Sequence, residues 1–581
     1  MSVSQDAASI AVDHCISDRS SPIAALARLG TYGKHKGNME SELHRYVAKR
    51  LPNPGFPLEP YTVKAVPHRC KRRPGITGKD VCVMLPHEVV AAYHSNPDIF
   101  KTCLLGDDGE LELFWHRMAD SEWVEQSTLK GDVQANPRKY IPVRLHGDDV
   151  SATKTTCLMC VTIASVFSSK LPADVAKLPI AVVPLLELSL DALDAIYSII
   201  RWSLEVLFHG EWPDKDPYGQ PWDLKSWRSK RRGPLAGGHR VVVSDIVGDL
   251  KYLKECMRLP FNYLMKKMCH LCRVEKGLRH EDSLVNVERF PHIPRRSHEE
   301  YMATFERSPP FARLPAFHLS CVRFDFMHVY CLGVVQIVVA STIQELMAEN
   351  VFHHQDIRDK RERIQTQLRE AYRRFAQWCR NNQQDHSQPM FTPERLNIHT
   401  TKPGTKPLMK SKAFNGMVIL QWLQSVLSTH TPGRHGAHRL MMIRALCRLW
   451  DLVRQPTIWF SRAQARSYMR DTERFLHISK MFFMRATSAR SKAWRIVPKH
   501  HAAWEMARYQ MQTLRNPGSH MCFADESFVG SLKSVVPQLH ANQKSSMRIL
   551  QRIYIRHRLR LAGRESRVSG HIGQKRKLPC S

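Results

Sequence analysis

An aspartate and a histidine stand three residues apart at the head of a long apolar segment. Asp325 and His328 lie in the sequence FDFMHVYCLGV, which continues with mostly apolar residues. If this segment is helical, positions i and i+3 share one face, so the two side chains could bind one metal ion, phosphate or water molecule. The alternative is a buried helix that Asp325 caps at its first turn, with His328 bonded to a backbone partner.

Two further acids each follow a segment that reads as a strand. Asp148 comes after the alternating residues 140–146, and Asp249 comes after a run of three valines that is typical of a strand buried on both faces. Groups at the carboxyl ends of adjacent strands converge on one site in sheet enzymes. Paired carboxylates repel unless cations neutralise them, so these acids predict Mg²⁺ (or Mn²⁺) and phosphoryl transfer. The alternative is that they are turn and cap acids, as Gly-Asp sequences often are.

A third carboxylate usually completes such a site. Asp525 and Glu526 stand at the start of an expected helix in FADESFVGSLK, and either acid could supply the ligand. The choice between them is open at this point.

A pair of cysteines at metal-ligand spacing follows the second acid. Cys269 and Cys272 form a CxxC knuckle, and His280, His292 and His298 come after it. With His292 and His298 the knuckle could make a structural Cys₂His₂ zinc site, because four protein ligands leave no open position. The alternative is a knuckle without zinc. A second CxxC, at 157–160, lies in a predicted strand, where positions i and i+3 point to opposite faces, which favours buried small residues.

The chain is strongly basic. Its 86 Lys+Arg against 54 Asp+Glu give a net charge of +32. Such a charge favours a polyanionic partner, with DNA first, RNA next, and a membrane surface less favoured. The basic residues near the C-terminus recur every four positions and then form a cluster typical of nuclear import: Arg548, Arg552, Arg556, Arg560, Arg564, Lys575, Arg576 and Lys577. The alternative for the arginines is a solvated helical face.

The pattern along the chain predicts a mixed α/β protein. We expect strands at 140–146, 154–167 and 240–244, a helix from Pro86, another at 190–208, and almost only helices from 315 to 515 around a linker at 397–412. Charges interrupt the apolar stretch 179–208, and the stretch 329–340 is too short to span a membrane, so both read as buried helices. The first residues resemble neither a signal nor a transit peptide, and fifteen scattered cysteines indicate reduced thiols.

The order of these motifs resembles that of eukaryotic DDE transposases of the CACTA/Plavaka and Kyakuja–Dileera–Zisupton types. The resemblance spans about 135–540. In it, Asp148 and Asp249 match the first two catalytic acids, Glu526 is similar to the third, and Asp325 with His328 matches an Asp-x-x-His element that supports the site. The segment Pro498-Lys499-His500-His501 resembles a Pro-Lys-x-His segment of the same family.

The resemblance implies an RNase H-like core that a large all-α insertion interrupts, a nuclear protein of a mobile element, and metal-dependent cleavage or strand transfer of DNA. The implied divisions are an accessory region at 1–135, the first part of the core at 136–315, the insertion at 316–515, the final core helix at 516–545 and a basic helical tail at 546–581. No separate DNA-binding finger or helix-turn-helix is recognisable. The alternative function is therefore a domesticated, non-catalytic nucleic-acid-binding protein that zinc stabilises on the same fold.

Overall fold

The computed structural model describes most of the chain beyond residue 57. The described residues are 58–69, 76–151, 157–184, 189–276, 284–352, 357–398, 406–429, 433, 435–532 and 545–574. The chain divides into two compact units, of which unit 1 comprises 1–258, 305–322 and 523–581 and unit 2 comprises 259–304 and 323–522. Unit 1 contains the sheet, and unit 2 is helical apart from the knuckle segment and loops.

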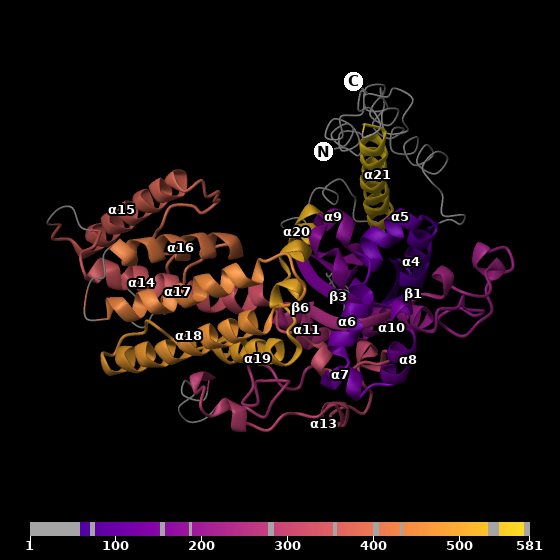
Figure 1. Ribbon diagram of the computed structural model, residues 1–581, viewed down its shortest axis with the longest axis horizontal. Coiled ribbons are helices and arrows are strands. Elements are labelled where there is room, and N and C mark those ends of the chain that lie inside the picture. Colours follow the sequence, from indigo (N-terminus) through magenta and orange to yellow (C-terminus); the bar gives the residue numbers. More distant parts are fainter. Residues whose placement is uncertain are drawn as a thin grey trace, which may run out of the picture. The chain divides into compact units, whose positions relative to one another are not determined.

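Unit 1 is built on one six-stranded mixed sheet with the strand order β1-β2-β5-β4-β3-β6 (Figure 1). The strands are β1 (Tyr61–Arg69), β2 (Ile76–Val83), β3 (Tyr140–Ser151), β4 (Cys157–Ser165), β5 (Leu178–Pro184) and β6 (Arg240–Gly248). Strands β3, β4 and β5 form an antiparallel meander, and β6 lies parallel to β3 at the edge. Val322 makes a parallel bridge to Ile246, so a later segment returns alongside β6.

The two strands that carry the predicted acids are longer than the sequence indicated. The alternation of β3 predicts an end near His146, but the strand continues to Ser151 because β4 pairs with it as far as Ser151↔Cys157. Asp148 is therefore inside the strand and not just past it. Likewise β6 runs on to Gly248, and Asp249 caps the following helix.

Helices cover both faces of the sheet. The α-helices of unit 1 are α4 (Pro86–His94), α5 (Pro97–Phe100), α6 (Glu110–Met118), α7 (Glu122–Glu125), α8 (Leu129–Ala135), α9 (Ala173–Ala176), α10 (Leu190–His209), α11 (Leu250–Cys256), α20 (Phe523–Ser531) and α21 (Ser545–Gln574). Helices α4 and α10 begin where the sequence predicts. Residues 179–184 are strand, which corrects the expectation of one buried helix across 179–208.

Side chains of β3 and β4 point alternately to two helical layers. On one face, the ring of Tyr252 in α11 lies over Gly147, and Tyr197 in α10 donates to Met159 Sδ at 3.2 Å. On the other face, α20 packs on β3, and α21 packs on β5 and β2, where the Tyr554 hydroxyl donates to the Pro179 carbonyl at 2.8 Å. The residues of β3 on the face opposite to Gly147, such as Arg144 and His146, therefore face α20.

Unit 2 is mainly helical. Its helices are η6 (Phe290–His292), α13 (His298–Met302), η9 (Met327–Val334), α14 (Val335–Ala348), α15 (Lys360–Asn381), α16 (Ala413–Thr429), α17 (Gly436–Val453), α18 (Arg462–Ser488) and α19 (Pro498–Thr513). Helix α17 packs between α16 and α18, and α18 packs on α19. The buried Arg439 guanidinium joins α17 to α14 through Glu345 at 2.9 Å and Glu349 at 2.7 Å. Part of the expected linker, 399–405, lies outside the described residues.

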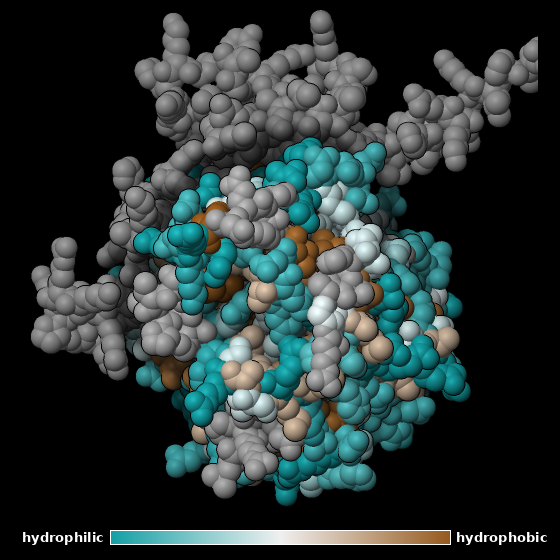
Figure 2. Space-filling model, turned by 90° about the vertical axis from the view of Figure 1, so that its left-hand side faces the viewer, coloured by the Kyte–Doolittle hydropathy of each residue, from teal (hydrophilic) through white to brown (hydrophobic). Residues whose placement is uncertain are grey.

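Among the described residues, Met327–Ala348 is the one helical stretch long and apolar enough to cross a membrane, and 72% of its most apolar window is buried. This burial agrees with the prediction of a core helix there. The face drawn in Figure 2 is mainly hydrophilic, with hydrophobic residues in small groups.

We expect Gly147→Ala to destabilise unit 1. An alanine Cβ at this position would stand 2.0 Å from the buried Tyr252 ring, and overpacking of this kind costs about 1–3 kcal/mol. Gly131→Ala on α8 is the matched control, because its Cβ would meet nothing within 4 Å and alanine favours the helix by roughly 0.5–1 kcal/mol. Urea unfolding measures both. Equal stabilities of the two variants would contradict the seating of Tyr252 on Gly147.

Candidate functional site

The parallel pairing of β3 and β6 brings Asp148 and Asp249 to neighbouring positions. Gly147 pairs with Gly248 at the end of the parallel ladder. Asp148 follows Gly147 inside β3, whereas Asp249 is the first residue after β6 and caps α11. Local backbone bonds orient both carboxylates: Asp148 Oδ1 accepts from Asp149 N, and Asp249 Oδ1 accepts from Tyr252 N, each at 2.7 Å. Both acids are partly exposed.

A buried ionic cluster lies on the α20 side of the same strand. Asp525 of α20 is fully buried and meets Lys177 Nζ at 2.7 Å, Arg144 Nη2 at 3.2 Å and His146 Nδ1 at 3.8 Å. Burial raises the pKa of Asp525, but Arg144 and then Lys177 outweigh it and hold this pKa well below its ordinary value. The carboxylate is therefore charged and neutralised by two cations.

Arg144, His146 and Asp148 share one face of β3 because they alternate along it. Cys160 of β4, the register partner of Asp148, lies on this face as well. Burial raises the pKa of the Cys160 thiol, and the charges of Asp148 and Asp525 raise it further. Asp148 and the α20 acid thus lie within electrostatic reach of the same buried thiol. Glu526, the next residue of α20, is partly exposed, whereas Asp525 is buried and forms ion pairs with Arg144 and Lys177.

In unit 2, the cysteine knuckle meets two residues of a distant helix. Cys269, Cys272, His501 and Glu505 are all buried, and their ligand atoms lie within 4.8 Å of one another. Cys272 Sγ is 3.2 Å from His501 Nε2, which is 3.4 Å from Glu505 Oε1. Tetrahedral ligands about 2.0–2.3 Å from a metal stand roughly 3.3–3.8 Å apart, close to these two separations, so the group could hold a metal ion.

The electrostatics of this group favour a thiolate. Burial raises the pKa of Cys269, yet the Cys272 thiol and His501 bring it well below its ordinary value. Burial lowers the pKa of His501, but Cys269 and Glu505 raise it to about 9. Outside the four donors, Arg295 Nη1 pairs with Glu505 Oε2 at 2.6 Å and holds that carboxylate in place. A charged group that pairs in this way with the far oxygen of a ligating carboxylate orients the ligand.

The histidines that the sequence offered for this knuckle stand elsewhere. His292 is exposed at the end of η6, and His298 is the first residue of α13 and is partly buried. Neither is in the four-donor group, and His280 lies outside the described residues. The sequence signal for the residues that the structure brings to the knuckle is the i, i+4 spacing of His501 and Glu505 on α19. This spacing begins at the last residue of the Pro-Lys-x-His segment.

Asp325 and His328 form a helix cap. Asp325 Oδ2 accepts from the His328 backbone N–H at 3.0 Å and lies 2.7 Å from His328 Nδ1, while Oδ1 accepts from Cys522 N at 2.9 Å. The ligand atoms of Asp325, His328 and Cys522 also lie within 4.8 Å of one another, so this cap could hold a metal ion too. The helix that it opens, η9, is a π-helix, a form frequent at functional sites.

The C-terminal arginines lie on a helix that is partly core. Ile549, Leu550 and Ile553 of α21 are buried in unit 1. Arg548 is exposed, Arg552, Arg556 and Arg560 are partly buried, and Arg560 pairs with Asp174 at 3.2 Å. The side chain of Arg564 and the cluster Lys575-Arg576-Lys577 lie outside the described residues.

No protein-family model matches this chain, and no curated protein matches it in sequence.

We expect Asp525→Asn to cost about 3–5 kcal/mol of unfolding free energy, because it leaves Arg144 and Lys177 as buried, uncompensated cations. Glu526→Gln, one residue along the same helix, is the control and should change stability by roughly 0.5 kcal/mol or less. Because the folded pKa of Asp525 is lowered, its contribution is complete above the unfolded pKa of about 3.9 and is lost as the pH falls through the folded value. The difference in unfolding free energy between Asp525→Asn and Glu526→Gln should therefore narrow only below about pH 4. A constant gap down to pH 2 would contradict the charged state of Asp525.

The four-donor group predicts one tightly held metal ion per chain at the knuckle. Elemental analysis of the purified protein should find that ion in the parent and in His292→Ala and His298→Ala, and should find it lost in Cys269→Ser, Cys272→Ser and His501→Ala. The cap at Asp325 is the internal control, since His328→Ala should leave the knuckle metal in place. If His298→Ala loses the metal and His501→Ala keeps it, the ligands are instead the two cysteines with His292 and His298, as the sequence predicted.

Proposed function

We propose that this chain is a transposase-derived DNA-binding protein with an RNase H-like core that carries out metal-dependent phosphodiester cleavage or strand transfer. The observation that carries the proposal is the parallel pairing of β3 and β6, which ends at Gly147 and Gly248, the residues that precede Asp148 and Asp249. The mixed α/β architecture alone would fit many functions.

The topology of unit 1 supports the RNase H-like assignment. An antiparallel meander, β5-β4-β3, is followed across the sheet by the parallel strand β6 and by the parallel bridge at Val322. The long helical segment 323–522 belongs to unit 2, and the chain then returns to unit 1 as α20, which packs on β3. This order is the one that the resemblance to DDE transposases implies for a core with an all-α insertion.

Asp148, Asp249 and Glu526 are the residues that we assign to holding Mg²⁺. The assignment rests on the pairing of Gly147 with Gly248, the residues before Asp148 and Asp249, and on the partial exposure of all three acids. Among the described residues, the side chains grouped closely enough to hold a metal ion together are those of the knuckle and of the Asp325 cap, and this trio is not one of those groups. When bound, the metal ions would activate the attacking oxygen and stabilise the leaving one. Asp525 is not the third ligand in this assignment, because Arg144 and Lys177 already neutralise it; it positions α20 and hence Glu526.

Zinc is the metal we assign to the knuckle in unit 2. Two cysteine sulfurs, an imidazole and a carboxylate form a four-ligand set of the N/S/O kind that zinc prefers, and four protein ligands leave no open position for chemistry. Its role would be structural, since it would join the knuckle after α11 to α19. DNA as the partner follows from the net charge of +32, with contacts to the phosphate backbone in the main.

A nicking and strand-transfer assay on plasmid DNA with Mg²⁺ tests the proposal. We expect activity in the parent, and losses of about 10³-fold or more in Asp148→Asn, Asp249→Asn and Glu526→Gln, because each removes a metal ligand. Asp191→Asn, an exposed acid on α10, is the matched control and should keep the parent rate.

Two results separate the readings. Activity that survives both Asp148→Asn and Asp249→Asn would overturn the assigned roles. Salt-dependent DNA binding by the parent without any cleavage would instead support the non-catalytic, zinc-stabilised alternative on the same fold.

A further inference from the structure

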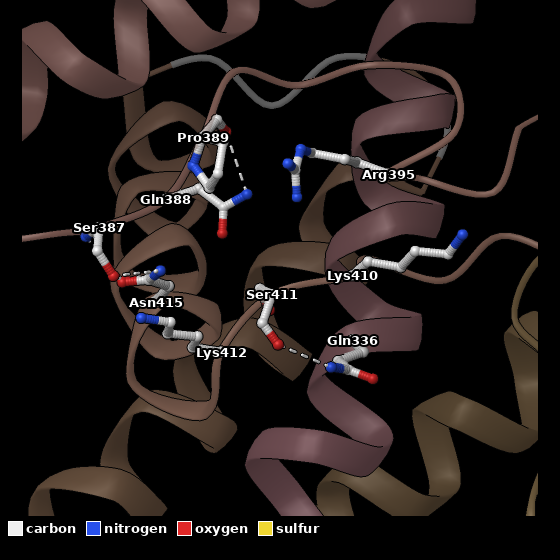
Figure 3. A pocket seen from close by; sticks show the side chains of 9 residues that line it. All are labelled: Gln336, Ser387, Gln388, Pro389, Arg395, Lys410, Ser411, Lys412 and Asn415. Carbon is white, nitrogen blue, oxygen red and sulfur yellow. Dashed lines mark hydrogen bonds between the residues drawn. The ribbon is translucent and has the colours of Figure 1, made fainter. Parts of the chain in front are cut away.

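Unit 2 contains a pocket whose lining is polar and basic. Its volume is about 480 Å³, and Arg395, Lys410 and Lys412, from two segments that precede α16, are among its lining residues. In Figure 3 the Arg395 guanidinium points toward Gln388, whereas the Lys410 side chain extends away from it. None of the nine lining residues is acidic. Three cations without a carboxylate to neutralise them within the lining create a positive potential, which favours an anionic ligand.

Backbone hydrogen bonds fix the frame that carries these cations. Lys410 N donates to the Arg395 carbonyl at 2.7 Å, and Gln336 Nε2 of α14 donates to the Ser411 carbonyl at 3.1 Å. Lys412 accepts the first bond of α16, from Gly416 N at 3.0 Å. The pocket therefore lies at the N-terminus of a helix of 17 residues, where backbone N–H groups and the helix dipole add to the attraction for an anion.

The pocket also holds two buried polar atoms that lack a protein partner among the described residues. Gln388 is 2% exposed. Its Nε2 donates to the Pro389 carbonyl at 3.2 Å, whereas its Oε1 has no hydrogen-bond partner. Figure 3 shows this oxygen directed into the pocket. Ser411 Oγ is likewise buried without a partner. A buried acceptor left unmet costs about 1–3 kcal/mol, which a ligand that donates to it would recover.

We propose that this pocket binds a nucleotide, through its phosphate groups on the three cations and through a sugar hydroxyl or base amino group on Gln388 Oε1. The cations need an anion, and the Gln388 acceptor needs a donor, so a ligand with both kinds of group fits better than inorganic phosphate. The volume is in the range of small-ligand sites and exceeds what one phosphate fills. The nucleotide could be free or part of a strand. This site goes beyond the proposed function, since it uses none of the acids of unit 1.

Isothermal titration calorimetry on the full chain tests the site, with ADP, inorganic pyrophosphate and a 5′-phosphorylated single-stranded 12-mer as probes. The pocket variant is Arg395→Gln/Lys410→Gln/Lys412→Gln. The control variant, Lys360→Gln/Arg470→Gln/Lys492→Gln, removes the same charge from exposed positions of the same unit outside the lining. We expect ADP affinity to fall at least about 100-fold in the pocket variant, since charge-assisted bonds contribute roughly 1.5–3 kcal/mol each. It should stay within about twofold in the control.

Gln388→Met separates a nucleotide from a bare phosphate. It should weaken ADP by about tenfold and leave pyrophosphate unchanged, because only ADP carries a donor for the lost oxygen. If the 12-mer binds the parent more tightly than the pocket variant and ADP does not bind the parent, the site takes a nucleotide of a strand. If ADP binds the parent more tightly than the pocket variant and the 12-mer does not bind the parent, the site takes a free nucleotide. If neither probe distinguishes the pocket variant from the control variant, the proposal is overturned. Thermal melting of both variants checks that each is folded.

Discussion

The buried carboxylate of Asp525 is the point on which unit 1 depends. It draws together β3 through Arg144, the residue before β5 through Lys177, and the helix α20, which are far apart in the sequence. A carboxylate and two cations are stable out of water only when each satisfies the others, so the cluster accepts one arrangement of these three segments. Residues 323–522, which belong to unit 2, precede α20, and this cluster binds α20 to the sheet of unit 1. The acids that we assign to metal binding inherit their positions from it.

Close packing on the opposite face of β3 complements this constraint. Gly147 and Gly248 lack side chains where the Tyr252 ring lies, so α11 approaches the ends of both parallel strands. Asp249 then caps α11 while Asp148 stays in the strand. The register pairs the two glycines, and one acid follows each of them. A bulky residue at either glycine would separate the helix from the strands that it aligns.

Unit 2 relies on a different kind of long-range junction. The knuckle at Cys269 and Cys272 has its partners on α19, where Glu505 is also paired with Arg295. A metal ion on these four donors would exert on unit 2 the constraint that the ionic cluster exerts on unit 1. The basic pocket at the start of α16 shares no residue with the knuckle, and its lining gathers three of the basic residues of the chain.

The sequence alone determined features that depend on neighbouring residues. Alternation and a valine run located β3 and β6, Pro86 marked the start of α4, and the cap by Asp325 was one of the two interpretations of its spacing with His328. Tertiary structure decided what depends on distant partners. The end of β3 was set by its pairing with β4, the partners of the knuckle lie 229 residues beyond Cys272, and only the cations facing α20 distinguished Asp525 from Glu526. The physical reason is that side-chain periodicity is a local property, whereas metal ligands and buried ion pairs are chosen by proximity that the chain acquires only when it folds.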